Sequence, residues 1–145
     1  MTTTLATMTN ADPRFYTLLG PYLARRDVHR QVGGPIYDDD NKTWIIATDN
    51  GAVTGFIGIR SQGGVVAESC YLVDENDTDL LALLIRAALA CVAPTPVRAT
   101  VRHARAAVYT SAGFTEAGRT NGFAKLVHPG TTPPPRPLRE RQPPC

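Results

Sequence analysis

A short helix that ends at a glycine, placed between two strand-like segments, is the feature that most constrains the fold of this chain. The helix is expected within Val101–Phe114, directly after the strand-like run Pro96–Thr100. Ala106 and Tyr109 are three residues apart, so they share one face of that helix. Gly113 suits the position just after a helix, where the backbone takes a left-handed conformation, because glycine has no side chain to clash. The segment therefore predicts a strand–helix–strand unit in which a small residue and a phenol point to the same side.

Strand-like and helical patterns alternate along the rest of the chain. Pro21 should kink or divide an N-terminal helical segment, because proline lacks the amide donor. Asn50-Gly51 favours a two-residue type I′ hairpin turn. The other expected elements are strands at Thr2–Thr9, Thr43–Thr48, Val53–Arg60 and Val65–Val73, a buried helix at Thr78–Val92, and closing strands at Thr115–Arg119 and Phe123–Val127.

Length and charge limit the class of protein. The chain has 145 residues and a formal net charge of +2, which by itself does not indicate a nucleic-acid-binding protein. Acids cluster at Asp38–Asp40 and Asp74–Asp79, whereas every formal charge from Leu80 to Thr115 is positive. The elements predict one domain over residues 1–128, followed by a flexible proline- and arginine-rich tail over residues 129–145 that cannot build a core.

The sequence contains no pattern typical of a membrane segment or a metal site. The N-terminus lacks a basic region followed by an apolar one, and the apolar run Leu80–Ala93 is too short to span a bilayer. Cys70, Cys91 and Cys145 are odd in number and lack metal-ligand spacing. We therefore expect a cytoplasmic protein with no metal and no membrane partner.

The C-terminal third resembles a pattern found in GNAT-type N-acyltransferases. Ala106, Tyr109 and Gly113-Phe114 keep the offsets of that pattern, and the element order from about Thr43 to His128 is similar to the GNAT core. The resemblance implies an α+β fold, with a mixed, mostly antiparallel sheet of six to seven strands flanked by helices. It also implies acyl transfer from acetyl-coenzyme A, or another acyl donor, to an amine on a small molecule, a protein or a nucleobase. Since the sheet of this family often pairs at its edges, a homodimer is also expected.

The loop before the long helix departs from the family pattern. Where the family has a glycine-rich loop for the coenzyme A pyrophosphate, this chain has the acidic segment Asp74–Asp79, which contains no glycine and no basic residue. Asp77 or Thr78 would cap the helix with its own side chain and use amide groups that a phosphate needs. We therefore expect weak or non-standard binding of coenzyme A.

Two side chains are candidates for acid–base chemistry. The resemblance assigns Tyr109 as the general acid that protonates the leaving thiolate, and a phenol with a pKa near 10 holds its proton at neutral pH. Glu68 lies within an expected central strand, where the family often places a base that acts on the amine. Tyr109 and Glu68 are the predicted catalytic residues.

The resemblance also implies donor-binding residues. Leu72 and Val73 stand where the family strand offers backbone groups to the donor, and His103 stands where the family usually has asparagine. Arg105 completes the predicted donor-binding set. On the acceptor side, Tyr37 and Asp38 belong to a loop in which acids would suit a cationic amine.

Two other functions stay open at this point. The chain could be a nucleic-acid (adenine) modification protein similar to phage Mom-like proteins, in which case Arg98, Arg102 and Arg105 would face phosphates. It could also be a catalytically inactive binding module, because the expected phosphate loop is degenerate.

Overall fold

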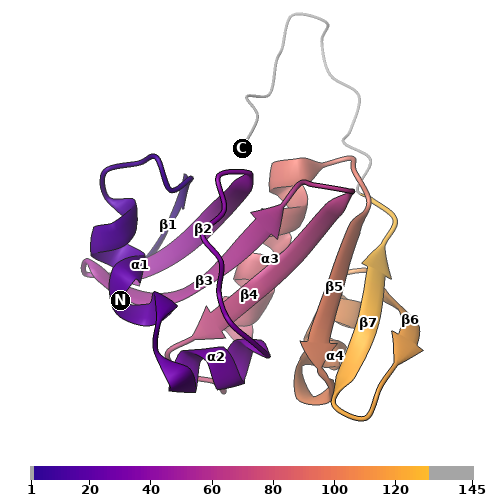
Figure 1. The fold of residues 1–145 in the computed structure, drawn as a ribbon. Coiled ribbons are helices and arrows are strands. Elements are labelled where there is room, and N and C mark those ends of the chain that lie inside the picture. Colours follow the sequence, from indigo (N-terminus) through magenta and orange to yellow (C-terminus); the bar gives the residue numbers. More distant parts are fainter. Residues whose placement is uncertain (1, 131–145) are drawn as a thin grey trace, which may run out of the picture.

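The fold is built on one central sheet, and the predicted α+β class is confirmed. The computed structural model describes residues 2–130, in which seven strands and four helices form (Figure 1). Apart from its first two residues, the tail predicted for residues 129–145 lies outside this range. In chain order the elements are β1 (Thr3–Met8), α1 (Phe15–Leu23), α2 (Arg26–Val32), β2 (Lys42–Asp49), β3 (Ala52–Arg60), β4 (Val65–Leu72), α3 (Thr78–Val92), β5 (Val97–Arg102), α4 (His103–Ser111), β6 (Thr115–Arg119) and β7 (Phe123–His128).

The sheet is joined at its middle by a single short parallel pairing. Its strand order is β1-β2-β3-β4-β5-β7-β6, and every neighbouring pair except β4–β5 is antiparallel. The β4–β5 pairing covers only Val65–Ala67 against Val97–Ala99. Beyond these residues the two strands diverge, so the sheet opens between them (Figure 1).

A bulge in β4 adds to this opening. Gly58 of β3 pairs with Glu68, but Phe56 pairs with Tyr71, so the β4 residues between them outnumber those of β3 by one. Ser69, at the bulge, has a φ of 56°, which is uncommon for a residue with a side chain. Bulges of this kind bend a strand and redirect its side chains.

Helices cover the two faces of the sheet unequally. In Figure 1, α1 and α2 lie in front of β1–β4, while α3 and α4 lie behind the sheet. Phe15, Trp44 and Phe56 belong to the core under α1 and α2, and Leu84 and Leu126 belong to the core on the other face. Burial of each such side chain contributes about 1.5–3 kcal/mol. The front face of β5, β7 and β6 carries no helix (Figure 1).

The strand–helix–strand unit around Gly113 forms largely as predicted. Gly113 has a φ of 107° and follows α4, and the Phe114 amide donates to the Tyr109 carbonyl at 3.2 Å. The Phe114 ring packs edge-on against Tyr109, with centroids 5.4 Å apart. The expected helix start was wrong by two residues, because Val101 and Arg102 extend β5 by pairing with β7.

The N-terminal half agrees with the sequence in its turns. Asn50 and Gly51 have φ values of 52° and 82°, as a type I′ turn requires. Pro21 lies inside α1, which ends two residues later, and a second helix follows, so the helical segment is divided. Within residues 2–130 there is no helix with the length and apolar character needed to cross a membrane.

Candidate active site

A narrow cavity lies where β4 and β5 diverge. Its volume is about 20 Å³, and Glu68, Ser69, Arg105 and Tyr109 are among the residues that line it. It adjoins two larger openings on the surface. The first, here called the donor cleft, has a volume of about 600 Å³ and lies between α2, the β4–α3 loop and α4. The second, here called the acceptor cleft, has a volume of about 420 Å³ and lies under the loop after α2.

Tyr109 reaches this central cavity from α4 and is almost fully buried. Its side chain is 2% exposed. Burial is the main cause that raises the pKa of Tyr109 well above its ordinary value, and the Cys70 thiol beside it contributes in the same direction. Burial also raises the pKa of Cys70 to about 11. Both groups therefore keep their protons at neutral pH.

Glu68 lies in β4 at the boundary between the central cavity and the acceptor cleft. It forms two ion pairs, with Lys42 Nζ at 2.9 Å and with Arg60 Nε at 3.2 Å. Desolvation alone would raise its pKa, but the hydrogen bonds and charges of Lys42 and then Arg60 outweigh that effect, so the pKa of Glu68 is lowered. Glu68 is therefore a fixed carboxylate at neutral pH.

Lys42, which contacts Glu68 and Ser69 of the candidate site, is the residue that sequence reasoning missed most clearly. It begins β2, and its side chain is fully buried. Its ammonium donates to the Tyr37 carbonyl at 3.0 Å and to Ser69 Oγ at 3.2 Å, and it lies 4.2 Å from the Trp44 ring centroid. Gly58 provides the room, because a Cβ there would lie 2.4 Å from Lys42 Cε. Desolvation lowers the pKa of Lys42, although Glu68 opposes that shift.

On the donor side, the backbone groups of β4 are already engaged. The Leu72 amide donates to Gln31 Oε1 at 2.8 Å, and Gln31 Nε2 donates to the Leu72 carbonyl at 2.9 Å. Arg105 donates to the Cys70 carbonyl at 2.8 Å and also to Gln31 Oε1. Val73, by contrast, is 54% exposed, and its amide donates to Thr54 of β3. Gln31 of α2 therefore occupies the place predicted for a donor at Leu72.

The donor cleft is lined by charged side chains of both signs. Arg30, Arg102 and Arg105 line it, together with the acids Asp27 and Glu75. These arginines come from α2, β5 and α4, so Arg102 and Arg105, from the positively charged segment Leu80–Thr115, meet Arg30 from a distant part of the sequence.

The acidic loop folds as expected from its side chains. Asp77 Oδ1 accepts a hydrogen bond from the Leu80 amide at 3.0 Å and caps α3. Asp74 Oδ1 similarly accepts from the Asn76 amide at 3.0 Å. The start of α3 thus has one of its free amides satisfied by its own chain, which leaves fewer for a phosphate.

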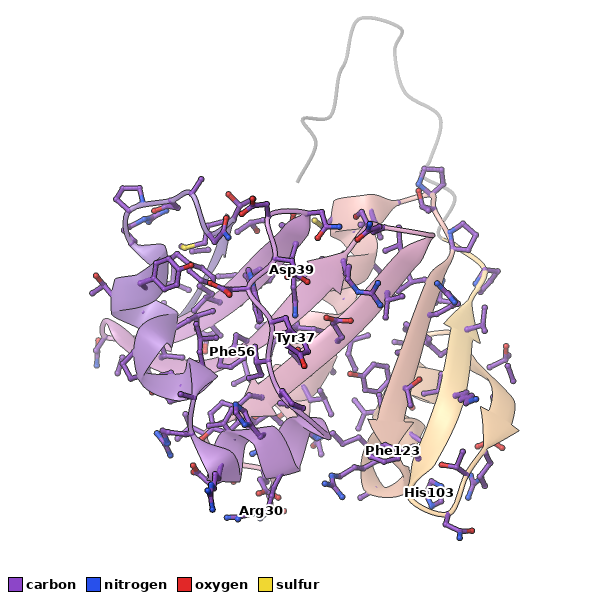
Figure 2. The ribbon with its side chains drawn as sticks, viewed as in Figure 1. Arg30, Tyr37, Asp39, Phe56, His103 and Phe123 are labelled. Carbon is purple, nitrogen blue, oxygen red and sulfur yellow. The ribbon has the colours of Figure 1, made fainter. Side chains whose placement is uncertain are left out.

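The predicted acceptor residues separate in the structure. Tyr37 lines the acceptor cleft and is 62% exposed, but Asp38 accepts a hydrogen bond from the Tyr16 hydroxyl and does not line the cleft. Asp39 lines it instead. Tyr37 and Asp39 lie together in front of the sheet, while His103 lies at the far end of β5 and lines none of these three cavities (Figure 2).

No metal cluster is found among residues 2–130, since no group of three or more His, Cys, Asp or Glu side chains there could hold an ion. The polar groups of the cavity are instead an ion-paired carboxylate, a buried phenol and guanidinium groups. Such a set can bind an ammonium, donate a proton to a leaving group and hold an anion.

Comparison with known proteins gives the fold but no sequence family. No family model matches the chain, and no curated protein matches its sequence. Among solved structures, an acyl-CoA N-acyltransferase from Pseudomonas aeruginosa matches with a TM-score of 0.64 and 14% identity, over 88% of this chain and 99% of the other. An aminoglycoside 6'-N-acetyltransferase from Enterococcus faecium matches with a TM-score of 0.64 and 14% identity, over 92% and 99%. The ribosomal-protein-S18-alanine N-acetyltransferase from Escherichia coli matches with a TM-score of 0.61 and 17% identity, over 92% and 97%. The fold is therefore that of the GNAT superfamily.

Proposed function

We propose that this chain of GNAT fold is an N-acyltransferase that moves an acyl group from acetyl-coenzyme A, or another acyl donor, to an amine. The observation that carries the proposal is the cavity at the opening of the sheet, which joins a donor cleft to an acceptor cleft. A donor entering from one side and an amine entering from the other would meet beside Tyr109 and Glu68.

The donor would enter between α2 and α4. Arg30, Arg102 and Arg105 are suited to bind its anionic groups by charge-assisted hydrogen bonds. Glu75 and Asp27 in the same cleft repel an anion, so we expect the overall affinity for coenzyme A thioesters to be weak. The acyl-bearing arm would reach Leu72 after Gln31 has moved aside.

The acceptor amine would lie in the acceptor cleft, where Glu68 and Asp39 attract an ammonium. A carboxylate whose pKa is lowered is a weak base. Glu68 would therefore bind the ammonium, and the proton of the ammonium would pass to water. The free amine then attacks the thioester carbonyl carbon, so that a C–N bond forms and the C–S bond breaks. The nitrogen releases its second proton to water, and water later returns a proton to Tyr109. Tyr109, which holds its proton, would donate to the departing thiolate.

A thiol-release assay tests the proposal. The purified chain is incubated with acetyl-coenzyme A, with longer acyl thioesters and with a panel of primary amines, and the acylated amine is identified by mass spectrometry. Amine-dependent thiol release is the expected result. Donor binding by calorimetry without any acyl transfer would support the inactive binding module instead, and a sub-micromolar dissociation constant would contradict the weak donor site.

We further propose a cytoplasmic location, which rests on the sequence alone. A homodimer joined at a sheet edge also stays a prediction, and size-exclusion chromatography with light scattering measures it. The adenine-modification alternative has no specific support in the geometry of the cavity.

A further inference from the structure

One face of the C-terminal half of the sheet is open and positively charged. Arg98 and Thr100 of β5 and Lys125 of β7 lie on the face away from the core, because the alternate residues of these strands are buried. In Figure 1 no helix lies in front of β5, β7 and β6. A groove of about 420 Å³ runs over this face and is lined by Arg60, Arg98, Thr100 and Lys125 among others.

The strand register places these cations in neighbouring rows on one face of the sheet. Arg60 pairs with Val66, and Val66 pairs with Arg98, so the two arginines lie two strands apart in one row across the sheet. Adjacent strands are about 4.8 Å apart, which places the two Cα atoms roughly 10 Å from each other. Lys125 pairs with Thr100 in the next row on the same face.

These charges are largely uncompensated within residues 2–130. Lys125 is exposed and has no hydrogen bond or ion pair there, and Arg98 donates to the Gly63 carbonyl but to no carboxylate. Arg60 contacts Glu68 through Nε, which leaves its terminal nitrogens available. Glu116 of β6 pairs with the buried Leu126 and therefore lies on the opposite face.

The groove adjoins the candidate active site at two points. Arg60 lines both the groove and the acceptor cleft, and Thr100 lines both the groove and the central cavity. A ligand lying along the groove would thus extend from three cations to a cleft that contains the acids Asp39 and Glu68.

We propose that the acceptor is the amine of an acidic peptide. Its carboxylates would lie on Arg60, Arg98 and Lys125, and its amine would enter the acceptor cleft between Asp39 and Glu68. The carboxylates of Asp39 and of the ion-paired Glu68 in the cleft, and the cations Arg98 and Lys125 in the groove, together complement an ammonium followed by carboxylates. The proposal rests on the N-acyltransferase function proposed above, of which it names the acceptor class.

A peptide fits this face better than a nucleic acid or the chain's own tail. Single-stranded nucleic acids use exposed aromatic rings as stacking platforms. Phe123 lies on this face, but its ring packs against Gly33, where a Cβ would be 3.0 Å from the ring, and Arg102 lies over it at 5.6 Å. Residues 131–145 carry three arginines and one glutamate, so their net charge has the same sign as the groove.

Fluorescence anisotropy measures this binding directly and needs no acyl donor. A labelled short peptide rich in glutamate, with a free N-terminus, is compared with a glutamine-rich peptide and with a single-stranded oligonucleotide. The variants are Arg98→Gln, Lys125→Gln and the double variant, and Arg26→Gln is the matched control because Arg26 is exposed at the start of α2, away from the groove. Melting curves verify that all variants fold.

We expect the acidic peptide to bind at least about tenfold more tightly than the glutamine-rich one. An exposed ion pair contributes up to about 1 kcal/mol, so each single variant should lose up to about fivefold in affinity and the double variant up to about twenty-fivefold. Arg26→Gln should change little. Equal binding of the acidic and glutamine-rich peptides, equal loss in Arg26→Gln, or preference for the oligonucleotide would overturn the proposal.

The donor-dependent step separates this inference from the enzyme function. If an acidic peptide binds through Arg98 and Lys125 but is never acylated, the docking surface is supported and the transferase function is refuted. If neutral peptides are acylated as fast as acidic ones, and the double variant has unchanged rates, the transferase function is supported and the acidic acceptor class is refuted.

Discussion

Replacement of Gln31 by alanine should have two opposite effects, because this side chain occupies the Leu72 backbone groups at which we propose that the donor binds. Gln31 exchanges two hydrogen bonds with the Leu72 backbone and accepts a third from Arg105. The alanine variant removes all three and exposes the Leu72 amide and carbonyl to the donor cleft.

The size of both effects follows from these bonds. A net hydrogen bond contributes about 0.5–1.5 kcal/mol, and the freed groups reach water in the neighbouring cleft, so the loss of stability should be about 2 kcal/mol. In a domain of this size that lowers the melting temperature by about 6–8 °C. The same bonds must break before a donor can use Leu72, so donor affinity should rise by about thirtyfold.

Calorimetric titration with acetyl-coenzyme A and a melting curve together test this reasoning. Asn41→Ala is a suitable control, because Asn41 donates an exposed amide hydrogen bond to Gln62 and neither residue lines the donor cleft. The control should shift neither quantity appreciably. A lower melting temperature with unchanged or weaker donor binding would show that Gln31 only stabilises the fold and that donors do not use Leu72.

The remaining predictions concern the central cavity. Glu68→Gln leaves the buried ammonium of Lys42 without an anionic partner, which should cost about 2 kcal/mol, less than a fully buried pair because Glu68 is 28% exposed; an unchanged urea midpoint would contradict this. Folding lowers the pKa of Glu68 below 4.5, so the stabilisation from Glu68 is present above that pH and is lost as pH falls through the lowered pKa. Between about pH 3 and 6 the melting temperature should therefore fall more steeply with decreasing pH in the wild type than in Glu68→Gln. An equal pH dependence of the two melting temperatures would refute the pairing. Tyr109→Phe should reduce the single-turnover acyl-transfer rate at least about tenfold while the melting temperature changes little, and an unchanged rate would remove the phenol from the mechanism. Gly58→Ala should destabilise by about 2–3 kcal/mol because its Cβ would meet Lys42 Cε at 2.4 Å and the Trp44 ring at 3.2 Å, and wild-type stability would show that Lys42 can move.

Interactions between residues close in sequence determine many of the turns and helix ends, so these could be predicted from the sequence. Asn50-Gly51 and Gly113 adopt left-handed backbone angles that few other residues tolerate, so these turns could be predicted from the local sequence. The bounds of α3 at Thr78 and Val92 were predicted correctly, because a capping residue precedes the apolar helix and prolines follow it. These signals act over a few residues and need no tertiary context.

The assignment of Val101 and Arg102 shows where local signals stop. Both residues suit a helix about as well as a strand, and pairing with Phe123 and Ala124 of β7 decided for the strand. Tertiary pairing of this kind outweighs intrinsic preferences, which amount to less than about 1 kcal/mol per residue.

The chemistry of the site was decided almost entirely by tertiary structure. Lys42 and Glu68 are 26 residues apart, and Gln31 lies 41 residues from Leu72 and 74 from Arg105. No local pattern marks such partners, since each contact depends on the strand register, on the bulge at Ser69 and on the divergence of β4 from β5. The sequence alone thus determined which elements form and proposed Tyr109 and Glu68. Only the assembled sheet decided that Glu68 is an ion-paired carboxylate, that Tyr109 is buried, and that Gln31 is hydrogen-bonded to the Leu72 backbone.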